Sequence, residues 1–205
     1  MLRRLPIVGV FGQGTPLPPE RTALARETGA MIAALGCHLL TGGGYGVMEA
    51  ASEGFTRVAE RRGLSIGIVP RPPHGAFDEP HRGADGRIYP NPFVEIAIRT
   101  PLPPRAENWH ETPARNHVNV LTADAIIALP GGAGTSNELE MAALYAGEDK
   151  AVPARRKTIL LGPAQEFSAA QRAAFVHATT CREARRYLTR ILLHRGLPFL
   201  ESETA

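Results

Sequence analysis

Residues 125–140 read AIIALPGGAGTSNELE, and this stretch decides the fold. The five apolar residues at 125–129 are typical of a short strand that is buried on both faces. A glycine-rich segment, 130–134, follows directly, and the spacing of apolar residues over 135–146 predicts a helix. Strand, glycine loop and helix in this order are the unit from which parallel α/β sheets are built.

The rest of the chain repeats this alternation of strand and helix. We predict strands at 6–11, 37–41, 64–69, 93–98 and 158–161, and helices at 20–35, 47–62, 113–121, 168–178 and 182–194. A proline-rich excursion at 70–92 interrupts the rhythm, and a loop of that length is usually functional or mobile. The prediction is a single α/β domain over residues 1–205, a Rossmann-like doubly wound parallel sheet with helices on both faces. Its strand-to-helix loops should meet at the carboxyl edge of the sheet, where a ligand would bind.

Composition excludes several classes of function. The 205 residues are 43% hydrophobic and 21% charged, and no apolar run approaches the roughly 20 residues that span a bilayer. Two cysteines, Cys37 and Cys181, are too few for a disulfide framework, so we expect a cytoplasmic protein. The net charge of +3 comes from arginines spread along the chain without interleaved aromatic residues, so we expect neither nucleic acid nor a membrane as a partner.

Three glycine-rich loops should lie at the ligand-binding edge. The loops at 41–46 and 130–135 each lead into a predicted helix, whose unpaired N–H groups and dipole favour an anion. Two such helix ends converging on one crevice would hold a phosphate without a lysine. The predicted phosphate- or nucleotide-binding residues are Gly12, Gly43, Gly44, Tyr45, Gly46, Gly131, Gly132, Ala133, Gly134 and Thr135.

Two side chains are candidates for chemistry at this edge. Glu138 could lie beside the phosphate site and face the ribose of a bound nucleotide, or it could close a capping box with Thr135 and serve only the helix end. Arg115 precedes the 125–129 strand. The chain has no G-x-x-x-x-G-K-[ST] motif, and Leu17 replaces the third glycine of the dinucleotide fingerprint. The histidines and carboxylates at 74–81 lack zinc-ligand spacing, so we expect no metal and no cofactor.

The glycine motifs resemble those of a known family. Residues 130–138, PGGAGTSNE, fit the PGGxGTxxE motif of the LOG family of cytokinin-activating phosphoribohydrolases, long labelled lysine decarboxylases. Residues 42–48, GGGYGVM, are similar to its second motif, GGGxxGLM, with one residue fewer between the glycines. The resemblance spans roughly residues 6–147. It implies that Glu138 and Arg115 are the catalytic pair and that the PGGxGT loop binds the 5′-phosphate.

The activity that this resemblance implies is hydrolysis of the N-glycosidic bond of a nucleoside 5′-monophosphate, which gives a free base and ribose 5-phosphate. It also implies a homodimer. The surroundings of Arg115 differ from the LOG pattern and are closer to a sister branch that includes molybdenum-cofactor carrier proteins. The alternative prediction is therefore a non-catalytic carrier or sensor for a phosphorylated pterin or a nucleotide.

Overall fold

The computed structural model describes residues 4–69, 82, 86–103, 108–148 and 157–200. One parallel sheet of seven strands forms its centre, in the order β4-β3-β2-β1-β5-β6-β7. The strands are β1 (Ile7–Phe11), β2 (His38–Thr41), β3 (Ser65–Val69), β4 (Ile96–Arg99), β5 (Ala125–Ala128), β6 (Thr158–Leu161) and β7 (Val176–Ala178). The helices are α1 (Pro19–Ala34), α2 (Val47–Thr56), α3 (Arg115–Thr122), α4 (Ala133–Glu148), α5 (Ala169–Ala174) and α6 (Cys181–His194), with a 3-10 turn, η2, at Ala164–Glu166.

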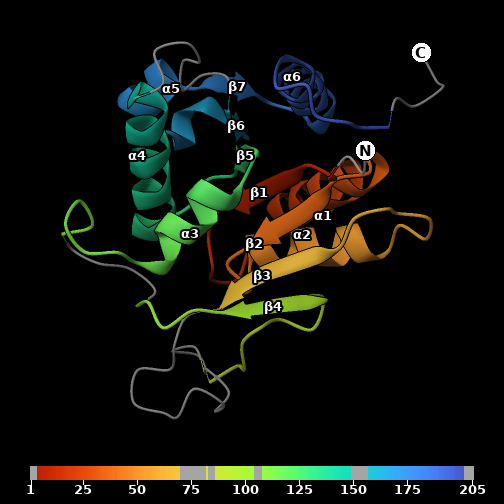
Figure 1. Cartoon of the computed structure of the whole chain (residues 1–205), viewed down its shortest axis with the longest axis horizontal. Coiled ribbons are helices and arrows are strands. Elements are labelled where there is room, and N and C mark those ends of the chain that lie inside the picture. Colours follow the sequence, from red (N-terminus) through yellow and green to blue (C-terminus); the bar gives the residue numbers. More distant parts are fainter. Residues whose placement is uncertain (1–3, 70–81, 83–85, 104–107, 149–156, 201–205) are drawn as a thin grey trace.

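Helices cover both faces of this sheet (Figure 1). On one face α1, α2 and α6 enclose a core of buried residues, and on the other face a second core lies against α3 and α4. The order of the strands reverses between β1 and β5, because the chain first builds outward to β4 and then returns to the other side of β1. In doubly wound sheets, ligands bind in the crevice outside the carboxyl ends of the strands at such a reversal. The predicted fold class is confirmed.

Strand β5 occupies the position that its sequence predicts. All four of its residues are buried, and it pairs in parallel with β1 on one side and β6 on the other. A strand with neighbours on both sides and helices on both faces has no surface in water, which is why its sequence is apolar throughout. Its carboxyl end delivers the chain directly to the glycine loop at 130–134.

Helices α1 and α2 pack with their backbones in contact, through two glycines. A Cβ atom on Gly29 would lie 1.9 Å from the carbonyl oxygen of Ala51, and one on Gly54 would lie 2.0 Å from the carbonyl oxygen of Arg26. Any side chain larger than hydrogen at either position would force the helices apart. This contact fixes α2, and therefore the loop that precedes it, relative to β1.

Three predicted boundaries are wrong. Helix α2 ends at Thr56 rather than at residue 62, and β4 spans Ile96–Arg99 rather than 93–98. The backbone of Gly63 lies so close to the strand before it that a Cβ would come 1.8 Å from the carbonyl oxygen of Cys37. The chain must therefore leave the helix early enough to return to the sheet at this point.

The third error lies in the predicted helix at 168–178. Helix α5 ends at Ala174, Phe175 is extended, and residues 176–178 form β7, which pairs in parallel with β6. A strand of three residues is too short to show a period of two. The capping box of Ser168 and Gln171 favours a helix start, and nothing in the sequence after it forces a stop.

Part of the predicted excursion at 70–92 lies outside the described residues, namely 70–81 and 83–85. In the portion of the chain that the structure describes, no helix combines the length and apolarity needed to cross a membrane.

Candidate functional site

A cavity of about 580 Å³ opens at the carboxyl ends of β1 and β5. The loop at 12–15, which follows β1, forms one wall, and residues 131–135, which follow β5, form the other. The N-terminus of α3 and the first turn of α2 contribute side chains. The residues that line the cavity include Gly12, Met48, Arg115, Gly132, Thr135 and Glu138.

The N-terminus of α4 faces this cavity. The helix begins at Ala133, and Gly131, Gly132, Gly134 and Thr135 all line the cavity. The first N–H groups of a helix have no carbonyl one turn earlier to accept them, so they are available to an anion. A Cβ atom on Gly132 or Gly134 would meet nothing within 4 Å. These glycines therefore leave open space where a ligand oxygen could approach the backbone.

The main chain of Gln13 joins the two sides of the crevice. Its N–H donates to the carbonyl oxygen of Pro130 at 3.3 Å, and its carbonyl oxygen accepts a hydrogen bond from the N–H of Val47 at 2.9 Å. Val47 is the first residue of α2, so the protein's own backbone already occupies one of the N–H groups at that helix end. The sequence prediction treated the ends of α2 and α4 alike, but α2 contributes only Met48 to the cavity lining, whereas several residues at the α4 end line it.

The predicted binding residues of the 43–46 loop do not line this cavity. Asn91 holds the loop, because its Nδ2 donates to the carbonyl oxygen of Gly44 at 2.7 Å and its N–H donates to that of Gly43 at 2.8 Å. The hydroxyl of Tyr45 donates to the carbonyl oxygen of Ile88 at 2.7 Å. Gly46 lines a separate hollow of about 440 Å³. These residues shape the turn between β2 and α2. Ala133 begins α4 but is likewise outside the cavity lining.

The carboxylate of Glu138 faces α3. Because α4 begins at Ala133, Thr135 lies within its first turn and is not its N-cap, so the capping-box alternative is wrong. The Oε1 atom of Glu138 accepts a hydrogen bond from Nδ2 of Asn119 at 3.0 Å. Glu138 is only 7% exposed and lines the cavity. It is therefore a buried carboxylate at the ligand site.

Arg115 is the cation that faces this carboxylate. It is the first residue of α3, and its Nη1 donates to the carbonyl oxygen of Gly42 at 2.7 Å. Its Nε is buried and has no hydrogen-bond partner among the described residues. A Cβ on Gly42 would lie 2.3 Å from Nη1, so any side chain there would displace the guanidinium. The second glycine motif thus positions Arg115 in addition to shaping its own turn.

Burial shifts the titration of both groups. Removal from water raises the pKa of Glu138, and the positive charge of Arg115 and the hydrogen bond from Asn119 oppose that rise. Removal from water lowers the pKa of Arg115, and the charge of Glu138 opposes that fall. Each group therefore favours the ionised form of the other. A raised carboxyl pKa next to a cavity is typical of a group that takes up and releases a proton.

Sequence reasoning missed the two asparagines that complete this arrangement. Besides Asn119, which holds Glu138, Asn116 donates from its Nδ2 to Oδ1 of Asn137 at 3.0 Å, and both α3 asparagines are buried. Their spacing of three places them on one face of α3, the face that meets α4. Two buried asparagines at helical spacing next to a candidate catalytic arginine are the signal that could have identified them.

Neither lysine takes part in the site as far as the structure describes it. Nζ of Lys157 donates to the carbonyl oxygen of Val120, and Lys157 is outside the cavity lining. Lys150 lies outside the described residues. Among the residues that are described, no group of three or more His, Cys, Asp or Glu side chains could hold a metal ion.

Solved structures with the same fold include molybdenum-cofactor proteins. A molybdenum cofactor carrier protein of Chlamydomonas reinhardtii is 26% identical with a TM-score of 0.64, and the match covers 93% of this chain and 99% of that one. A molybdenum cofactor binding protein of the phototrophic bacterium Rippkaea orientalis is 31% identical with a TM-score of 0.64, covering 92% and 98%. DNA processing protein A of Helicobacter pylori, at 14% identity with a TM-score of 0.57 and coverage of 90% and 80%, shares the fold.

A sequence relative with a significant match covers a smaller part of the chain. An uncharacterised protein of Archaeoglobus fulgidus is 32% identical over 135 residues, which are 66% of this chain and 72% of that protein. The model of the SLOG cluster4 family matches residues 5–181. This match supports the resemblance that the glycine motifs indicate. On this evidence the chain belongs to the SLOG cluster4 family.

Proposed function

We propose that this protein hydrolyses the N-glycosidic bond of a nucleoside 5′-monophosphate. One observation carries the proposal: Glu138 and Arg115, a buried carboxylate and a half-buried arginine from two different helices, line the same cavity as the N-terminus of α4. The helix end provides a place for the 5′-phosphate. The carboxylate then lies beside the sugar that the phosphate positions.

The residues fit the chemistry of this reaction. The C1′–N bond breaks with its electron pair passing to the base, and the ribose develops positive charge that the carboxylate of Glu138 stabilises. The oxygen of a water molecule bonds to C1′, Glu138 accepts the proton that the water loses, and the departing base takes up a proton. Arg115 can stabilise the negative charge on the base as it leaves. A correctly placed acid–base group of this kind contributes roughly 10²–10⁴-fold to the rate.

A second candidate function is a carrier of a phosphorylated pterin. The observation that favours it is the similarity to a molybdenum cofactor carrier protein and a molybdenum cofactor binding protein, which extends over nearly the whole of each chain. The same helix end would bind the phosphate of such a ligand. In a carrier the buried pair would hold the ligand, and no bond would break.

The test is to incubate the purified protein with AMP, GMP, CMP and isopentenyl-AMP and to measure released base. Glu138→Gln should lower base release at least a hundredfold while calorimetry still detects binding of the monophosphate. Glu20→Gln, an exposed glutamate in the first turn of α1, is the matched control and should leave the rate unchanged. Because the pKa of Glu138 is raised, this carboxylate should become protonated at a pH above the ordinary carboxyl value of 4.5. The rate of base release should therefore decrease as the pH is lowered, beginning above that value.

Two results would separate the candidates. No base from any monophosphate, together with retention of a molybdopterin cofactor, would refute the hydrolase and support the carrier. Base release that survives Glu138→Gln unchanged would remove Glu138 from the mechanism.

A further inference from the structure

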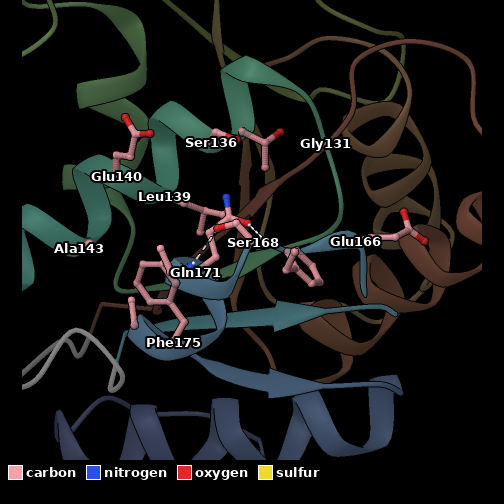
Figure 2. Close-up of a pocket in the computed structure, with 13 residues that line it drawn as sticks. Gly131, Ser136, Leu139, Glu140, Ala143, Glu166, Ser168, Gln171 and Phe175 are labelled. Carbon is pink, nitrogen blue, oxygen red and sulfur yellow. Dashed lines mark hydrogen bonds between the residues drawn. The ribbon is translucent and has the colours of Figure 1, made fainter. Parts of the chain in front are cut away.

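A second cavity lies on the other side of the α4 N-terminus. It also measures about 580 Å³, and the two cavities share Gly131 and Thr135 as lining residues. Figure 2 shows α4 on one side of it and the segment around Ser168, Gln171 and Phe175 on the other. The free end of α4 is thus flanked by two cavities of similar size.

The walls of the second cavity suit an uncharged ring. Leu139 and Ala143 of α4 face Phe167 and Phe175 across it, and Ser168 and Gln171 contribute hydrogen-bonding groups. Apolar walls with a few polar groups are typical of small-molecule sites. Among the described residues that line it, none is basic, so nothing there would attract a second phosphate. Two acidic side chains line it: Glu140 of α4, which is exposed, and Glu166, which is bound to Arg21 and points away from α4 in Figure 2.

Thr135 stands at the boundary between the cavities. It is only 5% exposed, and it lines both cavities. A Cβ on Gly131 would lie 2.2 Å from that hydroxyl, so the absence of a side chain at residue 131 keeps the hydroxyl open. A threonine hydroxyl can donate a hydrogen bond to a phosphate oxygen that lies at the end of α4.

We propose that the ligand carries a group on each side of its phosphate: a pyrophosphate or phosphodiester that joins two nucleoside-like halves. This proposal rests on the proposed function for the half that reacts. Glu138 and Arg115 line only the first cavity, so the sugar that is cleaved lies there, and the uncharged ring of the second half lies against Phe167 and Phe175. One cavity of this volume accommodates a small ligand by itself, so a monophosphate would leave the second cavity unused.

Calorimetry with AMP, ADP and diadenosine diphosphate tests the proposal. Diadenosine diphosphate should bind at least tenfold more tightly than AMP and than ADP, where ADP controls for the second phosphate. Ala143→Phe places a ring in the second cavity. It should abolish the extra affinity for diadenosine diphosphate without lowering the affinity for AMP. Leu144→Phe, the next residue of α4 and 45% exposed, is the matched control and should change none of the affinities. Ala170→Trp fills the same cavity from an exposed position of α5 and serves if Ala143→Phe does not fold.

Each result bears on one proposal or the other. Equal affinities for the three ligands would overturn the proposal of a ligand with a group in each cavity, even if AMP is cleaved. So would an extra affinity for diadenosine diphosphate that persists in both Ala143→Phe and Ala170→Trp. A loss of AMP binding in Ala143→Phe would place the base of a monophosphate in the second cavity and would overturn it as well. Tight binding of diadenosine diphosphate that depends on the second cavity, without release of base from it or from any monophosphate, would support it and refute the hydrolase.

Discussion

Replacing Gly132 by alanine should separate ligand binding from stability. The φ angle of Gly132 is not positive and a Cβ there would meet nothing within 4 Å, so the folded protein accepts the methyl group without strain. At such a site the substitution stabilises a protein by about 0.4–1 kcal/mol, because alanine gives the unfolded chain fewer backbone conformations than glycine does. For a chain of this length, that is a rise in Tm of roughly 1–4 °C.

Binding should change in the opposite direction. The methyl group would occupy the open space over the first turn of α4, where Gly132 lines the cavity. We expect AMP affinity in calorimetry to fall at least tenfold, or about 1.4 kcal/mol, while a thermal melt shows unchanged or higher stability. Gly131→Ala is the contrasting variant, because its Cβ would lie 2.2 Å from Oγ1 of Thr135 and should lower stability as well. Wild-type affinity in Gly132→Ala would refute the placement of the phosphate at this helix end.

Three further predictions concern the scaffold. Gly29→Ala should cost about 1–3 kcal/mol in urea unfolding, because its Cβ would lie 1.9 Å from the backbone oxygen of Ala51; unchanged stability would contradict that close packing. Burial raises the pKa of Cys37 to about 12 and that of Cys181 to about 11, so neither thiol should react with a thiol reagent at pH 8 until the protein unfolds. Burial lowers the pKa of Lys157 from 10.5 to about 8. Between pH 8 and 10.5 the folded protein therefore binds fewer protons than the unfolded chain, and its free energy of unfolding should increase as the pH rises through this range. Lys157→Met should lose this rise, and parallel pH profiles of the two proteins would disprove the account.

The sequence predicts the sheet well because its central strands are buried on both faces. Strand β5 shows only apolar residues and is followed by glycines, so its position and its neighbours follow from pattern alone. Strand β7 is different: it has three residues, lies at the sheet edge and takes its structure from β6. The return of the chain after α2 is also constrained from outside the helix, since the backbone of Gly63 lies close to that of Cys37. Such contacts between distant segments cannot be predicted from the local sequence pattern.

The same distinction applies to the site. The PGGxGTxxE motif predicts the α4 end and Glu138 because all of these residues lie within one strand–loop–helix unit. The motif cannot tell which way the carboxylate turns, since that depends on Asn119 and Arg115 from another helix. The 43–46 loop has the composition of a phosphate loop, yet contacts from Gln13 and Asn91 give it a structural role. Similar glycine-rich sequences can therefore support a binding site or simply position one.

The two backbone bonds of Gln13 have a consequence for how this site can vary. They link the loop after β1 to both Pro130 and the start of α2. Because the link needs only a main-chain N–H and carbonyl, it does not depend on the side chain at residue 13, which separately donates to Oγ1 of Thr15 and to the carbonyl oxygen of Pro16. Proline alone would break it on the Pro130 side, since proline has no N–H to donate. A substitution at residue 13 would thus change the chemistry presented to the ligand and the support of residues 15 and 16, while the link between Pro130 and the start of α2 stays in place.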